Sequence, residues 1–339
     1  MRRQAHLDIL RITASYAVVL LHTVSKKIGA GGVFFVYDGL VRWAVPMFVM
    51  ISGALLLDPN KEITIAGLWK KNILKMILSL WIWSVLYCIW EFFINHRDLN
   101  YVAKTMVTGY WHMWYIFMII ALYIMTPVFR IIVKERQILV YCLAVFFVFS
   151  FFLPTVRTMI QYSKFAENPA IREIVNHYDI TDWRLVFWYI PYFFMGYYLN
   201  TTDTLEKYQF AVFTLAVIGF IWNIYDNFTL TYQNGALIKE FYDALRLPVL
   251  FQSVGLFVLV KHLARRLESV ILSELVQYTF GVYLIHLLFR EVLDSFFGLN
   301  AQTYSFALWA PLLALLIYSL SMLGTAVINQ ISRLGKKSQ

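Results

Sequence analysis

The first apolar segment of the chain, residues 6–24 (HLDILRITASYAVVLLHTV), contains three ionisable side chains, Asp8, Arg11 and His22. An ionisable group inside the hydrocarbon of a membrane costs about 2.5–3.5 kcal/mol or more, so it normally faces a cavity, a partner or a substrate path. Successive helical residues turn by about 100°, which brings Arg11 and His22 onto one face, about 16 Å apart along the axis. The segment therefore predicts a membrane helix whose polar face joins two depths of the bilayer.

The composition places the whole chain in the same class. Hydrophobic residues make up 60% of the 339 residues, charged residues only 14%, and the mean hydropathy is +0.63. These values lie outside the range of soluble proteins and predict an all-α, polytopic membrane helix bundle. The net charge of +9 comes from basic residues between apolar runs, as insertion topology requires, so we expect no nucleic-acid partner. Cys88 and Cys142 lie inside apolar runs, and neither a disulfide framework nor a metal site is indicated.

Apolar runs that can cross about 30 Å of hydrocarbon recur along the sequence. Together with the first segment they predict about ten transmembrane helices, near 6–24, 34–57, 72–94, 112–133, 137–153, 183–199, 208–225, 241–260, 270–292 and 304–331. The runs at 137–153 and 183–199 are the shortest. The N-terminal Met-Arg-Arg leads into the first helix without a small-residue cleavage site, so we expect an uncleaved, cytoplasmic N-terminus.

The lysines and arginines predict that both termini are cytoplasmic, because positive charge concentrates on that side. With ten helices, the cytoplasmic segments contain Arg2, Arg3, Lys61, Lys70, Lys71, Arg130, Lys134, Arg136, Lys207, Lys261, Arg265, Arg266, Arg333, Lys336 and Lys337. The opposite side contains only Lys26, Lys27, Arg97, Lys104, Arg157, Lys164, Arg172 and Lys239.

Residues 154–182 are predicted to form the longest loop, on the outer side. Their mixed charges fit a solvated loop or a contribution to acceptor binding. No internal repeat, low-complexity tract or linker interrupts the chain, so we interpret residues 1–339 as one membrane-embedded domain.

Four sequence blocks resemble a known family. They are Asp8, Arg11 and His22 in the first helix, VPMFVMISGALLL at 45–57, WHMWYIFMIIALYIMTPVFR at 111–130, and YTFGVYLIHLL at 278–288. In this order the blocks resemble the acyltransferase 3 family of integral membrane acyltransferases, and within it the branch that includes O-acetyltransferases of bacterial surface glycans. The resemblance implies a bacterial cytoplasmic (inner) membrane enzyme that uses an acyl-CoA donor.

His22 is the candidate general base of such a reaction. A histidine near its ordinary pKa can take a proton from a hydroxyl and return it to a leaving group. The alternative is a buried histidine that bonds another helix. Arg11 has the planar, permanently charged fork that suits a phosphate or an acyl-thioester oxygen, with Asp8 one turn earlier to orient it. A purely structural Asp8–Arg11 pair is the alternative there.

The cytoplasmic mouth of the third helix carries a basic cluster, KKNILK, with Lys71 and Lys75. The family tends to place an Arg-x-x-Arg pair here, and coenzyme A carries phosphates that would suit these cations. This sequence has Asn72 and Lys75 at the matching positions, and a lysine offers a point charge rather than a bidentate fork. Cofactor binding by Lys71 and Lys75 is one interpretation, and topology alone is the other.

Two further helices carry polar candidates. His112, Trp114 and Tyr115 cluster at the outer end of the fourth, where an aromatic belt accounts for tryptophan and tyrosine, while His112 could bind a sugar. In the ninth, Tyr283, His286 and Arg290 share a face by their spacing, so a second polar face there is expected to meet the first. Ser52 and Gly53 are small residues of the kind that let membrane helices approach closely.

Together the residues and the resemblance predict an O-acyltransferase. We expect acetyl-CoA as the acyl donor, no metal, membrane lipids as surroundings, and a hydroxyl of an extracytoplasmic or lipid-linked glycan as acceptor. Arg11, His22 and His286 are the predicted catalytic residues, and Asp8, His112, Trp114, Tyr115 and Tyr283 contact substrate. The alternatives are a transporter of sugars or lipid-linked glycans, a sensor or scaffold, or an acyltransferase for a cytoplasmic small molecule.

Overall fold

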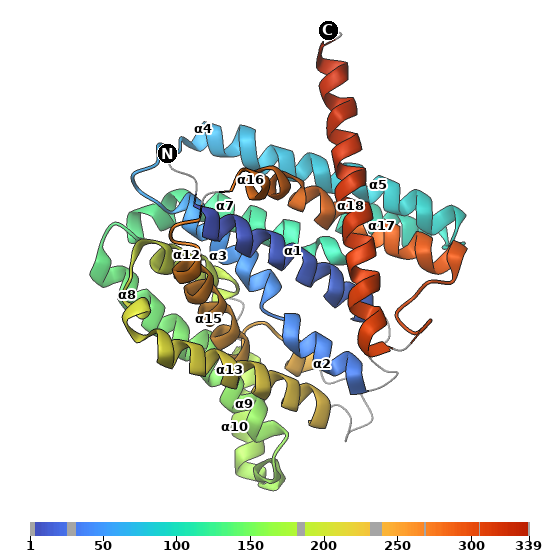
Figure 1. Ribbon diagram of the computed structural model, residues 1–339. Helices are drawn as coiled ribbons and strands as arrows, with labels where there is room; N and C mark the ends of the chain where they lie inside the picture. Colours follow the sequence, from blue (N-terminus) through green and yellow to red (C-terminus); the bar gives the residue numbers. More distant parts are fainter. Residues whose placement is uncertain are drawn as a thin grey trace. The chain divides into compact units, whose positions relative to one another are not determined.

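The computed structural model describes residues 4–25, 32–181, 187–230, 239–267, 269–304 and 306–337. Within these ranges the chain is helical and contains no β-strand, so the prediction of an all-α bundle is confirmed. Figure 1 shows the helices coloured along the sequence.

Contacts divide the chain into two compact units, and the prediction of one domain stays a prediction. Residues Met1–Ala54 and Val140–Gln339 form the first unit, and Leu55–Leu139, inserted into its sequence, form the second. The first contains α1 (Ala5–Ser25), α2 (Gly32–Val41), most of α3 (Ala44–Leu56) and of α8 (Arg136–Phe146), η4 (Phe147–Phe152), α9 (Leu153–Gln161), η5 (Lys164–Glu167), α10 (Pro169–Thr181), α12 (Ile190–Thr201), η6 (Leu205–Tyr208), α13 (Gln209–Tyr225), η7 (Asp226–Leu230), η8 (Lys239–Tyr242), α15 (Leu247–Leu263), α16 (Val270–Leu275), η9 (Val276–Tyr278), α17 (Thr279–Phe297) and α18 (Phe306–Lys337). The second contains α4 (Ile65–Leu68), η2 (Trp69–Ile73), α5 (Leu74–Phe93), α6 (Leu99–Thr108), η3 (Trp111–Met113) and α7 (Trp114–Ile132).

Within the part of the chain that the structure describes, eight helical runs are long and apolar enough to cross a membrane: Ala5–Ser25, Val33–Leu56, Ile65–Phe93, Leu99–Ile132, Arg136–Gln161, Leu205–Thr229, Val270–Phe297 and Ala307–Leu334. Each contains or largely overlaps one of the ten predicted spans. The predicted span 241–260 corresponds to the shorter α15, which starts later because Pro248 lies in its first turn, a position that suits proline. The predicted span 183–199 corresponds to α12 and lies partly outside the described residues. The cytoplasmic location of both termini stays a prediction.

The second span is interrupted, which the sequence did not predict. α2 ends at Val41 and α3 begins at Ala44, so the last carbonyls of α2 lose their helical partners inside an apolar run. Two side-chain amides from other helices replace those partners at Gly39: the carbonyl oxygen of this residue accepts from Asn223 Nδ2 at 3.1 Å and from Gln252 Nε2 at 3.0 Å. The break is therefore held by α13 and α15, in a region where no lipid group can supply the bonds.

The prediction of a long loop at 154–182 is wrong, because most of this segment is helical. Asn168 and Pro169 start α10: the side-chain oxygen of Asn168 accepts from the backbone N–H of Ala170 at 3.0 Å, and Pro169 takes the first helical position. Ser163 caps η5 in the same way through Phe165 N–H. The charged composition obscured these two helix starts.

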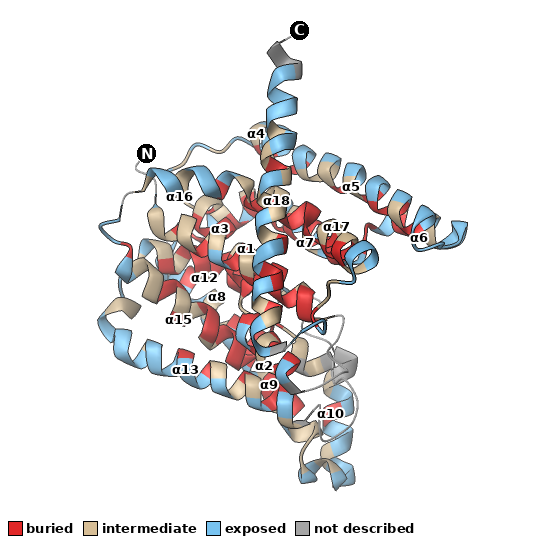
Figure 2. Cartoon of the chain, turned by 45° about the vertical axis from the view of Figure 1, so that its right-hand side comes forward, coloured by how far each residue is buried: buried red, intermediate tan, exposed pale blue. Residues whose placement is uncertain are grey.

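Helix α1 is the central element of the first unit. It packs against α2, α15, α17 and α18, and Figure 2 shows buried residues along most of its length. Helix α13, in contrast, exposes most of its surface and buries Ala216, Gly219 and Asn223 against its neighbours. Most of the length of α1 is thus covered by helices of its own unit.

Helices α3 and α12 touch backbone to backbone at two glycines. A Cβ atom on Gly53 would lie 1.8 Å from the carbonyl oxygen of Phe193, and one on Gly196 would lie 1.9 Å from that of Met50. No side chain can move aside to relieve either clash, because both obstacles are main-chain atoms. The expectation that Gly53 permits close helix approach is confirmed.

We expect Gly196→Ala to lower the free energy of unfolding by about 1–3 kcal/mol or more, because α3 and α12 must separate to accept the methyl group. Unfolding of the purified protein by SDS titration in mixed micelles measures the change. Gly324→Ala is the matched control, since its Cβ would meet side-chain atoms of Phe289 and Ile285, at 3.1 and 3.3 Å, and a side chain can yield. Equal stability of the two variants would contradict the backbone contact.

Candidate active site

Two histidines meet where α1 packs against α17. His22 Nδ1 lies 2.7 Å from His286 Nε2, and the two rings are nearly parallel, with an interplanar angle of 11°. His286 is buried, while His22 is half-buried and keeps part of its ring accessible. The polar faces of the first and ninth predicted spans therefore come together at these two rings.

The backbone of α17 decides which nitrogen of each ring carries the proton. His286 Nδ1 lies 2.8 Å from the carbonyl oxygen of Tyr283 and 3.0 Å from that of Val282. Because carbonyl oxygens only accept hydrogen bonds, Nδ1 of His286 must be the protonated nitrogen. In the neutral ring Nε2 is then an acceptor, so His22 donates through its own Nδ1–H and carries its lone pair on Nε2. The geometry assigns to His22 the tautomer of a general base.

Arg290, one turn after His286, also joins α17 to α1. Its Nη1 donates to the carbonyl oxygen of His22 at 2.8 Å, and its Nη2 pairs with the carboxylate of Glu291. Tyr283 lies on the same face, with its ring 6.3 Å from the ring of His286. Of the three residues that the spacing placed on one face, His286 and Arg290 contact His22 and Tyr283 lies beside His286, and Glu291 is an addition that the sequence reasoning missed.

Arg11 and Asp8 lie toward the other end of α1, and they do not form the structural pair that was one of the sequence alternatives. Both side chains are partly exposed, and no ion pair joins them among the described residues. Arg11 makes no hydrogen bond or ion pair with any described residue. Among the described residues, Asp8 included, no partner therefore occupies the guanidinium of Arg11.

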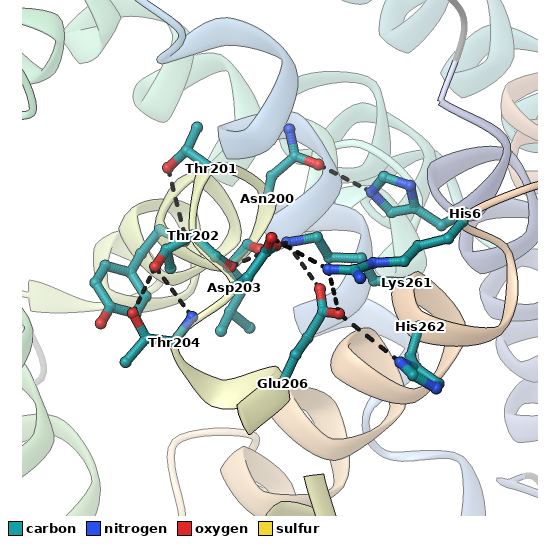
Figure 3. Close-up of polar contacts among 12 residues, drawn as sticks. His6, Asn200, Thr201, Thr202, Asp203, Thr204, Glu206, Lys261 and His262 are labelled. Carbon is teal, nitrogen blue, oxygen red and sulfur yellow. Dashed lines mark hydrogen bonds and ion pairs between the residues drawn. The ribbon is translucent and has the colours of Figure 1, made fainter. Parts of the chain in front are cut away.

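A neighbouring group of charges is already satisfied within the protein (Figure 3). Lys261 Nζ donates to the carbonyl oxygens of Leu199 and Thr202 at 2.8 and 2.9 Å and to Asp203 Oδ1 at 3.0 Å. This hydrogen bond and the Lys261 charge hold the pKa of the Asp203 carboxyl below its usual value. Glu206 pairs with Arg265 at 2.7 Å.

The bonds in Figure 3 join the end of α12 to the end of α15, and His6 extends them to α1 through Asn200 Oδ1 at 2.9 Å. The lysine and the arginine here each have acidic partners, so they hold the turn together and are poorly placed to bind an anionic ligand. Arg11, on the same helix as His6, has no acidic partner among the described residues.

The remaining predicted site residues belong to the second unit. Lys71, in the π-helical turn η2, and Lys75, at the start of α5, are both exposed. His112 is buried among aromatic rings, with its ring edge-on to those of Tyr87 and Tyr110 at 5.4 and 5.7 Å. Their roles in cofactor and sugar binding stay predictions.

Trp114 and Tyr115 begin α7 next to His112. Trp114 is 40% exposed, and Tyr115 is partly exposed. Trp114 and Tyr115 are thus accessible at the surface of their unit, whereas His112 is buried in its interior. Substrate contact by either ring stays a prediction.

One sequence comparison adds to this geometry: residues 4–328 match the profile of the Acyltransferase domain family, the acyltransferase 3 family. The chain belongs to that family. No curated protein and no solved structure matches it. The protein is therefore a multi-pass membrane acyltransferase, and the finer assignment of its residues depends on the geometry described above.

The acyltransferase also contains buried ion pairs that the sequence reasoning did not single out. Asp38 pairs with Arg42 beside the break of the second span, and Asp226 pairs with Arg246 at 2.5 Å. The sequence did contain a signal for the first of these pairs, because charges within apolar runs are rare and Asp38 and Arg42 are four residues apart. Arg42 also donates to the carbonyl oxygen of Tyr242 at 3.1 Å, which ties α2 to η8.

We expect Arg246→Met to lower the free energy of unfolding by about 3–5 kcal/mol, because it leaves the Asp226 charge buried without this partner. The double variant Arg246→Met/Asp226→Leu should recover most of the loss, since no charge then remains buried. SDS titration of the purified variants tests both statements. A double variant as unstable as the single one would show that Arg246 acts mainly through other contacts.

Proposed function

We propose that the protein is an O-acetyltransferase of the bacterial cytoplasmic membrane, which moves an acetyl group from acetyl-CoA to a hydroxyl of an extracytoplasmic or lipid-linked surface glycan. The observation that carries the proposal is the hydrogen-bonded pair His22–His286, which directs Nδ1–H of His22 toward His286 and so puts the lone pair of His22 on Nε2. The family supports acyl transfer, and the resemblance of the sequence blocks to glycan O-acetyltransferases supports the acceptor class.

In the proposed reaction His22 Nε2 removes the proton of the acceptor hydroxyl. The acceptor oxygen attacks the carbonyl carbon of the thioester and forms a tetrahedral intermediate. When this intermediate collapses, the carbon–sulfur bond breaks, and the protonated His22 returns its proton to the departing thiolate of coenzyme A. During the step the imidazolium charge of His22 is stabilised by the acceptor nitrogen of His286. His286 is thus a positioning residue, which fixes the tautomer and the ring orientation of His22.

Arg11 is proposed to hold the donor toward the cytoplasmic end of α1. Its guanidinium has no competing partner among the described residues, and a planar fork can give two parallel hydrogen bonds to a phosphate or a thioester oxygen. The axial distance between Arg11 and His22, about 16 Å, requires either that the pantetheine arm extends along the helix or that an acyl group is relayed. Lys71 and Lys75 are proposed to attract the phosphates of the donor.

The break in the second span is the observation that favours the transporter alternative, because discontinuous helices often line transport sites. Incubation of membranes with labelled acetyl-CoA separates the two functions. An acyltransferase transfers label to a glycan fraction or hydrolyses the thioester, and a transporter does neither. A wild-type protein that is present at normal level and gives neither product would reject the proposed activity.

We expect His22→Ala to abolish detectable transfer, a loss of about 10²- to 10⁴-fold, while binding of coenzyme A to purified protein survives. His286→Ala should leave a measurable residual rate. His286→Gln should exceed that rate, because the Gln oxygen can accept the Nδ1–H bond of His22. Labelled transfer in membranes of equal protein content gives the rates. Substantial transfer by His22→Ala would reject His22 as the base.

We expect that Arg11→Lys will not restore function, although it keeps the positive charge. A lysine gives up the planar geometry and one of two parallel hydrogen bonds to the donor. The apparent KM for acetyl-CoA in the same membranes should rise. Lys207→Arg, a charge-conserving exchange on another helix, is the control. Near-normal transfer by Arg11→Lys would show that only the positive charge of Arg11 matters, and that its planar geometry does not.

A further inference from the structure

The second unit contains an open pocket that none of the residues proposed for acyl transfer lines. Its volume is about 230 Å³, and it lies where the segment 59–68 meets the end of α7. The lining residues are Pro59, Ile63, Thr64, Ile65, Leu68, Thr126, Pro127, Arg130, Ile131 and Lys134. They comprise apolar residues, two threonines and two cations, and include no carboxylate.

Arg130 builds one wall of this pocket. Its Nη1 donates to the carbonyl oxygens of Leu56 and Asp58 at 2.9 and 2.8 Å, and its Nη2 donates to that of Lys61 at 2.6 Å. The loop before α4 is thereby folded around the guanidinium, which forms no ion pair with an acidic side chain of the described residues. This wall of the pocket is preformed and carries the positive charge of Arg130.

Lys134, one turn after Arg130, supplies the second positive charge. Its side chain is exposed and engages no hydrogen bond or ion pair among the described residues. With two cations and no acid in the lining, the pocket is complementary to an anion of one or two charges. Both cations belong to segments that the distribution of lysines and arginines predicts to be cytoplasmic.

The apolar part of the lining is complementary to the hydrocarbon of an amphiphile. Ile65 is 63% and Ile131 68% exposed, and both lie on helical runs that are long and apolar enough to cross the membrane. The pocket is thus open toward the surface that contacts lipid. Its volume is below the roughly 300–1,000 Å³ typical of pockets for drug-sized molecules, so it fits a headgroup better than an entire nucleotide cofactor.

We propose that this pocket binds the phosphate headgroup of an anionic phospholipid of the cytoplasmic leaflet. Lys134 pairs with the phosphate, the threonines face the polar remainder of the headgroup, and the acyl chains lie along Ile65 and Ile131. Basic pockets at the cytoplasmic ends of membrane helices are suited to such headgroups, because the leaflet there is rich in anionic lipid. The site goes beyond acyl transfer, and its occupation does not depend on the proposed reaction.

The test uses the full-length protein in nanodiscs that contain equal amounts of phosphatidylglycerol and phosphatidylcholine. Native mass spectrometry gives the ratio of the two lipids that stay bound after release. We expect the wild type to retain phosphatidylglycerol preferentially and Lys134→Ala to lower the ratio roughly fivefold. Lys134→Arg should keep the wild-type ratio. Arg136→Ala, which removes a cation of the same segment outside the lining, is the matched control.

A second measurement locates the lipid. Phosphatidylglycerol should slow hydrogen–deuterium exchange of residues 58–68 in the wild type and not in Lys134→Ala. Equal lipid ratios for the wild type and Lys134→Ala would overturn the proposal. It would also be overturned if coenzyme A, added without phosphatidylglycerol, protected residues 58–68 and the lipid did not, since the pocket would then serve the donor. Both measurements report lipid binding directly, so they test the proposal even if the wild-type protein shows no acyl transfer activity.

Discussion

A polar group that lies in hydrocarbon has to find its hydrogen-bond partners within the protein, and this constraint organises the first unit. The end of α2 illustrates it: the carbonyl oxygen of Gly39 accepts from Asn223 and Gln252 on two other helices. The same requirement pairs Asp226 with Arg246. The bonds to Gly39 join helices that are 184 and 213 positions apart, so polar residues contribute to the arrangement of the bundle as well as to its chemistry.

The proposed reaction centre depends on the same constraint. Two main-chain carbonyls of α17 fix the proton on His286, and His286 in turn fixes the proton on His22. Helical carbonyls are usually occupied by N–H groups four residues ahead, so an extra acceptor bond to a side chain is a local feature of this turn. The position of the lone pair on His22 Nε2 therefore depends, through His286, on the backbone of α17, and a charged orienting group is not required.

Cations in this protein fall into two groups. Lys261 and Arg290 donate to main-chain carbonyls and pair with acids, and they hold segments of the first unit together. Arg11 and Lys134 make no such bonds among the described residues. The distinction is invisible in the sequence, where all four are basic residues in or beside apolar runs. It separates the cations that hold the fold from those that can meet an anion.

Much of the fold followed from hydropathy, because a membrane span has a fixed minimum length and eight of the predicted spans are found. The meeting of the His22 and His286 faces was also predictable, from helical spacing and from the cost of burying charge. The break at residues 42 and 43 was not, since the hydropathy of Val33–Leu56 is that of one continuous span and the hydrogen bonds to Gly39 come from residues 184 and 213 positions away. The helices within 154–181 were missed because their charged composition resembles that of a loop.

The backbone contacts at Gly53 and Gly196 have a consequence for movement. Because each glycine faces a main-chain carbonyl of the other helix, α3 and α12 pack without intervening side chains at these two points, and a change of rotamer cannot adjust the contact. At the interface between α17 and α18, by contrast, Gly281 and Gly324 face the side chains of Thr325 and Phe289. These side chains can change rotamer while the two backbones stay in place.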